Sequence, residues 1–138
     1  MPKPRFHFAD ERGTAAIEFA MLAPALVAML LGIVCYGGYF WLSHSVQQSA
    51  NDSARAAIGG LNKAERASLA QASVTAGLPA YSILDPKAVK VVVVEDAQRM
   101  TVTVSYDASA TPFWLFKGIL PMPSSTIASN AVVRLGGY

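Results

Sequence analysis

The first third of the chain is one uninterrupted apolar run. No charged residue occurs between Glu18 and Asp52. About 20 apolar residues in a helix, each rising roughly 1.5 Å, cross a bilayer core of about 30 Å. The pattern therefore predicts a transmembrane helix, which we place at residues 14–43. Residues 1–13 are predicted to be a short disordered leader, and residues 44–138 a small exported domain.

The leader sets the expected orientation. It carries Lys3, Arg5 and Arg12 against two acids, and basic residues beside a first span favour the cytoplasmic side. A secretory signal peptide is the competing interpretation. Its apolar core is usually shorter, about 7–15 residues, and a removable signal has no reason to keep an acid at its start. A retained anchor is therefore favoured, with the N-terminus in the cytoplasm.

Beyond the span, small apolar residues recur at intervals of three and four. This spacing predicts that the helix continues to Gly59-Gly60 with one stripe, within residues 43–58, facing the domain. A second helix is predicted to begin with Asn62 as its cap, supported by Glu65, and to stop at Gly77. The apolar residues with this spacing are Val46, Ala50, Ala54, Ala57, Ile58 and, just beyond the stripe, Leu61.

β-Branched residues near the C-terminus predict three strands. Residues 89–95 and 100–106 read as a hairpin in which Val102, Val104 and Tyr106 face the helix. A third strand at residues 126–135 completes an antiparallel sheet, which needs a helix against one face for stability. The predicted fold is α+β: a long N-terminal transmembrane helix continues into a small exported domain with a second helix and a three-stranded antiparallel sheet.

Residues 111–123 are too apolar for a free connection between strands. Three interpretations are open: the segment covers the small sheet, meets another subunit, or dips into the membrane surface. Exposed apolar patches usually mark contact sites, and we favour packing or subunit contact. Phe113, Trp114 and Phe116 are the candidate contact residues.

Within the span, Pro24 is expected to bend the helix because it removes a backbone hydrogen bond. Four aromatic residues follow where the helix should leave the membrane, as in an interfacial belt. Small residues along the span fit either close packing of helices or the ordinary composition of membrane helices. The belt residues are Tyr36, Tyr39, Phe40 and Trp41.

Composition argues against several classes of function. The net charge is only +2 and the basic residues are scattered, so nucleic acid is not an expected partner. His7 and His44 lack neighbours at metal-ligand spacing, and residues 45–138 contain no His or Cys. Neither catalysis, a metal site nor a cofactor is therefore expected. Cys35 is expected to be a small buried hydrophobe rather than a reactive thiol.

Glu18 is the anomaly of the apolar run. A carboxylate in a membrane helix costs a few kcal/mol and is kept mainly where a positive group meets it. The residues around it carry a family resemblance. A basic residue and Gly13, four small or apolar residues and then Glu18-Phe19 at the start of a long apolar helix form the pattern of type IV pilin-like precursors. The string RGTAAIEFAMLAP resembles the TadE-like pseudopilins of tight adherence (Tad, Flp-type) pilus systems.

The resemblance covers residues 12 to about 45 and implies a processing event. A membrane prepilin peptidase is expected to cut after Gly13 and leave Thr14 as the new amino terminus. Glu18 and Phe19 are then expected to serve peptidase recognition and the registry of subunits. Gly13 is also expected to interrupt the helix just before Thr14. The simpler alternatives are a Glu18 that reaches the membrane interface and a Gly13 that only breaks the helix.

Cleavage would supply the missing partner of Glu18. A free α-amino group has a pKa near 7.7–8.0 and is mostly protonated at neutral pH. The new ammonium on Thr14 would lie one helical turn from Glu18, or would reach Glu18 of an adjacent subunit. Pairing across subunits would fix their stagger, because a lone charge in a low-dielectric setting is costlier than a hydrogen-bonded pair.

The resemblance therefore implies an assembly protein, a minor pseudopilin acting in a Tad pilus for surface adhesion. Its expected location is the inner membrane, with the C-terminal domain periplasmic. Its expected partners are the prepilin peptidase, other pilins and pseudopilins, the inner-membrane pilus assembly machinery and membrane lipid. The alternative is an uncleaved, single-pass membrane-anchored binding or sensor domain.

Overall fold

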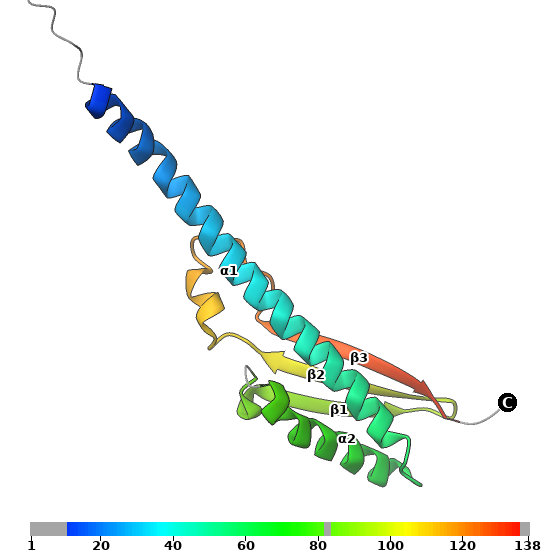
Figure 1. The fold of residues 1–138 in the computed structure, drawn as a ribbon. Coiled ribbons are helices and arrows are strands. Elements are labelled where there is room, and N and C mark those ends of the chain that lie inside the picture. The colour runs from blue at the N-terminus through cyan, green and yellow to red at the C-terminus, as the bar shows by residue number, and fades with distance from the viewer. Residues whose placement is uncertain (1–10, 82–83, 136–138) are drawn as a thin grey trace, which may run out of the picture.

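One long helix carries the rest of the chain on its C-terminal half. The computed structural model describes residues 11–81 and 84–135. Figure 1 shows α1 running along the molecule, with α2 and the sheet against its C-terminal half and its N-terminal half projecting beyond them. The predicted α+β fold is confirmed. The elements are α1 (Glu11–Ala57), α2 (Lys63–Gly77), β1 (Val89–Glu95), β2 (Arg99–Asp107), β3 (Thr126–Arg134) and the short 3₁₀ helices η1 (Leu78–Tyr81), η2 (Pro86–Ala88) and η3 (Pro112–Phe116).

The start of α1 differs from the prediction. Gly13 does not interrupt the helix, because α1 already begins at Glu11. One glycine in a helix is only about 1 kcal/mol less favourable than alanine, and adding a residue to an existing long helix is favourable. Residues 11–13 are thus helical rather than disordered, while residues 1–10 of the predicted leader lie outside the described residues.

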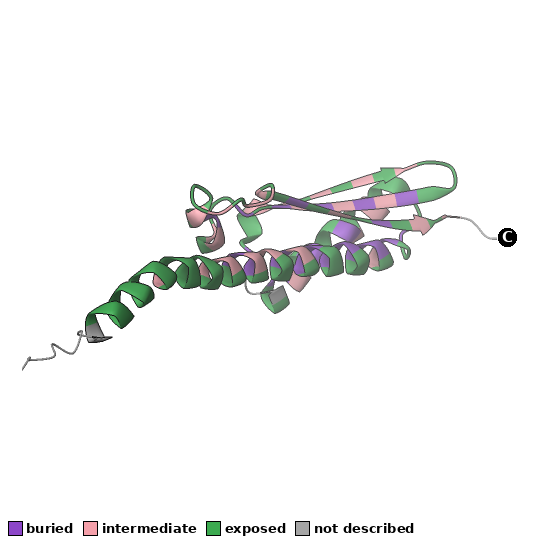
Figure 2. Ribbon diagram, turned by 90° about the horizontal axis from the view of Figure 1, so that it is seen from above, coloured by how far each residue is buried: buried purple, intermediate pink, exposed green. Residues whose placement is uncertain are grey.

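Pro24 lies inside α1 without ending it. Figure 2 shows that α1 bends in its N-terminal part, as expected for a helix that lacks one backbone N–H and accommodates a proline ring. The C-terminal part is straighter and carries the domain. The proline therefore changes the direction of the projecting half and leaves the domain-bearing half intact.

The three strands form an antiparallel sheet in the order β1-β2-β3. Their bounds agree with the predicted strands to within one residue at each end. Val102, Val104 and Tyr106 are buried, as predicted, and the residues between them face the other side. Asp96 closes the hairpin between β1 and β2. Its carboxylate accepts hydrogen bonds from the backbone N–H groups of Gln98 and Arg99, at 2.8 and 2.7 Å.

Both helices cover the same face of the sheet. α1 packs on β2 and β3, and α2 packs on β1 and on α1. Figure 2 shows the buried positions of α1 gathered on the side that faces the sheet. The predicted stripe is confirmed at four positions and wrong at Ile58. Ile58 and the following Leu61 are exposed because α1 ends at Ala57. The four confirmed positions are Val46, Ala50, Ala54 and Ala57.

Three serines share the buried side of α1, which sequence reasoning missed. Ser45, Ser49 and Ser53 are all buried. The hydroxyl of Ser53 donates to the carbonyl of Ala50 at 3.0 Å, and that of Ser45 donates to the carbonyl of Trp41 at 3.0 Å. A buried hydroxyl that bonds to its own helix needs no partner from another element. These small residues therefore let the sheet and α2 lie close to α1.

A charged clamp fixes α2 against β1. The Arg66 guanidinium donates to both carboxylate oxygens of Glu95, at 2.7 and 2.9 Å, and to the carbonyl of Gly60 at 2.7 Å. A Cβ on Gly60 would lie 2.7 Å from the backbone nitrogen of Arg66, so this close turn needs glycine.

As predicted, Asn62 caps α2, and its side chain accepts from the backbone N–H of Glu65 at 2.9 Å.

Candidate functional site

The projecting half of α1 is an apolar rod without cover from its own chain. Residues 14–34 are exposed apart from three half-buried positions, and apolar side chains point outward around the helix. Among the described residues, this is the one helix long and apolar enough to cross a membrane. These 21 residues rise about 31 Å at roughly 1.5 Å per residue, close to the thickness of a bilayer core. The exposed large apolar residues are Ile17, Phe19, Met21, Leu22, Leu26, Val27, Met29, Leu30, Ile33 and Val34.

The residues predicted to take part in processing lie at the free end of this rod. Gly13, Thr14, Glu18 and Phe19 are all exposed, and Thr14 and Glu18 stand four residues apart on consecutive turns. A Cβ on Gly13 would meet no described atom within 4 Å. Glu18 forms no ion pair with any side chain that the structure describes. The site is therefore open on all sides to a protease or to a neighbouring helix.

At the other end of the rod, a segment after β2 wraps onto α1. We call residues 112–123, which include η3, the collar. In both Figures 1 and 2, η3 and the segment after it lie at the end of the domain from which α1 projects. Three contacts seat the collar on one turn of α1. The Phe113 ring lies against Gly38, the ring centroids of Trp114 and Tyr39 are 6.0 Å apart, and the Tyr36 hydroxyl donates to the carbonyl of Pro121.

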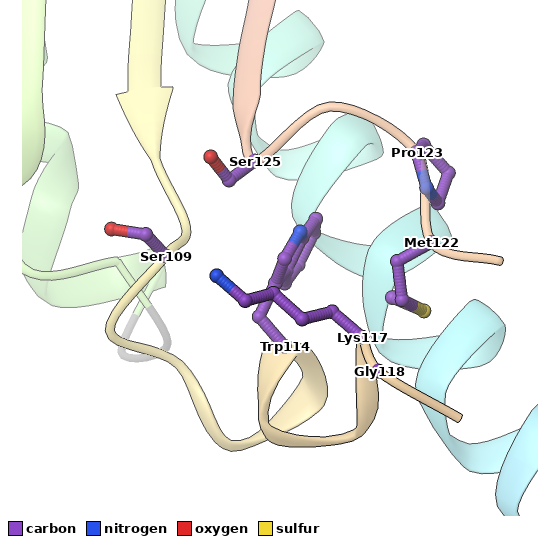
Figure 3. A pocket seen from close by; sticks show the side chains of 7 residues that line it. All are labelled: Ser109, Trp114, Lys117, Gly118, Met122, Pro123 and Ser125. Carbon is purple, nitrogen blue, oxygen red and sulfur yellow. The ribbon is translucent and has the colours of Figure 1, made fainter. Parts of the chain in front are cut away.

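Trp114 holds the collar by packing alone. Its side chain is 5% exposed, and its indole Nε1 has no hydrogen-bond partner among the described residues. Figure 3 shows Trp114 beside Lys117 in the hollow that the collar makes with the two strand ends, lined also by Ser109 and Ser125. Because no hydrogen bond is made, the contribution of Trp114 to stability comes from ring contact and burial.

The predicted contact residues are thus turned partly inward. Trp114 is buried by its own chain, and Phe113 and Phe116 are half-buried. The collar residues that do face outward are Leu115 and Ile119, exposed to 78% and 72%. Sequence reasoning missed these two individually. The signal was present in the apolar composition of the segment, but which side chains turn outward depends on how η3 lies on α1.

The predicted aromatic belt divides into two pairs. Phe40 and Trp41 are exposed, at positions where a belt would lie. Tyr36 and Tyr39 instead contact the collar. The division follows from helix geometry. Tyr36 and Tyr39 are three residues apart and share one face of α1, whereas Phe40 and Trp41 point away from that face. Cys35 is buried, as expected.

The described residues do not form a cluster of metal-ligating side chains. Within residues 11–81 and 84–135, no three His, Cys, Asp or Glu side chains come together as a metal site would require. The ion pair between Arg66 and Glu95 holds the fold together. Two hydrogen bonds from the Arg66 guanidinium lower the pKa of Glu95 below its ordinary value and keep the carboxylate charged.

Comparison with known families finds a match for most of the long helix α1. Residues 13–55 match the family model described as TadE-like protein. This segment is TadE-like. The match begins at Gly13, includes Thr14, Glu18 and Phe19, and ends two residues before the end of α1. The resemblance predicted for residues 12 to about 45 is therefore confirmed, and it extends farther along the helix.

The TadE-like match bears on function at a coarse level. Similarity to this family over residues 13–55 implies association with a Tad pilus and suggests interaction with other pilus components. The matched residues all lie in α1, so α2, the sheet and the collar are outside the matched range. No curated protein and no solved structure matches the chain.

Proposed function

We propose that this protein is a pseudopilin that a prepilin peptidase cleaves after Gly13 and that then acts in assembly of a Tad pilus for surface adhesion. The domain lies in the periplasm, the rod spans the inner membrane and the leader stays in the cytoplasm. The observation that carries the proposal is the exposed rod with its TadE-like sequence, which leaves Gly13, Thr14 and Glu18 accessible at its free end. Its partners are the peptidase, other pilins and pseudopilins, and the inner-membrane assembly machinery.

The exposed surface of the rod needs to be covered both before and after assembly. Exposing ten large apolar side chains to water is energetically unfavourable. Exposed apolar patches of this size mark membrane or protein contacts. Before assembly the bilayer covers them. After extraction the equivalent rods of neighbouring subunits replace the lipid, because a filament of such helices buries the same surface.

The uncut chain presents its scissile bond within a helix. Gly13 and Thr14 are the third and fourth residues of α1, and a protease needs an extended backbone at the bond it cuts. The first turn of a helix frays readily because its N–H groups lack intrahelical partners. Glycine lowers the free energy needed for this unwinding by about 1 kcal/mol relative to alanine. In this proposal Gly13 helps the first turn to open and does not break it permanently.

Cleavage also changes the electrostatics of the free end. The peptide nitrogen of Thr14 becomes an ammonium, one helical turn before Glu18. In a bundle of rods, an ammonium from one subunit and Glu18 of its neighbour neutralise each other, whereas a misregistered neighbour leaves both charges unpaired in an apolar setting. Glu18 therefore selects the stagger of the subunits.

The test is the mass of the product. The full chain is expressed in cells with a working prepilin peptidase and in matched cells whose peptidase carries a substitution of a catalytic aspartate. We expect a membrane-extracted chain that begins at Thr14 in the first cells and retains residues 1–13 in the second. An uncut chain in both would refute processing and favour the anchored binding or sensor domain.

A further inference from the structure

The collar lies at a defined height above the rod. Its contacts on α1 are Tyr36, Gly38 and Tyr39, which follow the last uncovered residue of the rod, Val34, by two to five positions. At roughly 1.5 Å per residue, this places them about 3–8 Å beyond the end of the rod. The polar layer on each side of a bilayer core is about 5–8 Å thick.

The outer surface of the collar has the composition of a membrane-interface segment. Leu115 and Ile119 are exposed large apolar residues. Phe40 and Trp41 on α1 are exposed at the same level. Exposed apolar and aromatic side chains at this height suit the headgroup region, where they enter the acyl boundary.

We propose that the collar sits in the headgroup layer of the periplasmic leaflet, so that lipid covers Leu115 and Ile119 while the protein awaits assembly. This rests on the proposed membrane anchoring of the rod and adds a second lipid contact to it. The rod alone allows the domain to tilt and rotate at the surface. A collar seated in the interface, and fixed to α1 through Phe113 and Trp114, sets the depth and tilt of the whole domain.

Site-directed spin labelling of the full chain tests this placement. In a Cys35→Ala background, nitroxides are attached one at a time to Leu26→Cys in the rod, Ile119→Cys in the collar and Leu61→Cys. Leu61 is a matched control because it is an apolar residue, 89% exposed, beyond the C-terminal end of α1. The proteins are placed in vesicles of phosphatidylethanolamine and phosphatidylglycerol, and collisions with oxygen and with a water-soluble nickel chelate are measured.

We expect the Ile119 label to be several-fold less accessible to the nickel chelate than the Leu61 label, and the Leu26 label to be protected most. If the Ile119 label is as accessible as that at Leu61 while Leu26 stays protected, the collar proposal is wrong and the anchoring stands. An accessible Leu26 label would instead refute the anchoring. Protection of Ile119 that disappears on dilution with lipid would show that a second copy covers the collar, which also overturns the proposal.

Discussion

The ring of Phe113 occupies the space that a side chain on Gly38 would need. A Cβ built on Gly38 would lie 2.4 Å from two carbons of that ring. Gly37, the preceding residue, has no described atom within 4 Å of the equivalent point. One of two adjacent glycines therefore receives the collar, and the other faces away from it.

Gly38→Ala should displace the collar. Overpacking of a well-packed contact is destabilising by about 1–3 kcal/mol, and the Phe113 ring has to move for the new methyl group to fit. Gly37→Ala is the matched control and should leave the domain at least as stable as the original, since it meets nothing. Thermal unfolding of the full chain in detergent measures both. Equal unfolding temperatures for the two variants would show that Gly38 does not seat the collar.

Trp114 offers a separate test of how the collar is held. Trp114→Ala should destabilise the domain by about 3–5 kcal/mol, the range for a large buried aromatic. Trp114→Phe should cost much less, because it keeps a ring beside Tyr39 and the indole N–H has no partner to lose. Denaturant titration compares the variants, and cleavage after Gly13 should be unchanged in both. A phenylalanine variant as unstable as the alanine variant would indicate an unseen role for the indole nitrogen.

The clamp between α2 and β1 predicts a pH dependence. The pKa of Glu95 is lowered in the folded state by Arg66, so the clamp stabilises the fold above the ordinary glutamate pKa near 4.3. That stabilisation is lost as the pH falls through the lowered value. The unfolding temperature of Glu95→Gln should therefore lie below that of the original chain at pH 7, and the gap should narrow below about pH 4. Lys90→Gln, an exposed change on the same strand, should show a small shift at every pH. A gap for Glu95→Gln that stays constant from pH 7 to pH 3 would contradict this account.

The helical first turn predicts a kinetic effect on processing. Gly13→Ala should slow cleavage by roughly fivefold, because about 1 kcal/mol more is needed to unwind the turn. Adding Ala15→Gly to that variant should restore much of the rate, since it weakens the same turn without touching residue 13. Time courses with membranes containing the peptidase measure the rates. If the second glycine restores nothing, the requirement is for glycine itself at the cut and unwinding is not limiting.

Periodicity and composition predict the helices and strands, but they do not predict the contacts between these elements. The stripe of α1, the cap at Asn62 and the alternation of β2 follow from local patterns, and the structure confirms them. The first turn of α1 differs from the prediction because a single glycine costs a long helix only about 1 kcal/mol and does not break it. The seat of Phe113 on Gly38 joins residues far apart in the chain, and no local pattern specifies such a pair.

The proposed processing site differs from the fold in this respect. A short motif at fixed spacing is the reason that the sequence points to Gly13, Thr14 and Glu18, and the family match begins at the same glycine. Their chemistry depends on a new terminus and on neighbouring subunits. A single chain contains neither of these, so no local pattern in it specifies the roles proposed for these residues.

Incorporation of Glu18→Gln into filaments is the most direct test of the central claim, that Glu18 holds the ammonium which cleavage creates. In cells expressing the Tad machinery, the amount of this protein in sheared filaments is divided by the amount of chain cut after Gly13. The ratio corrects for any loss of peptidase recognition. Pairing predicts that the ratio for Glu18→Gln falls far below that of the original chain. A ratio equal to the original would contradict the account.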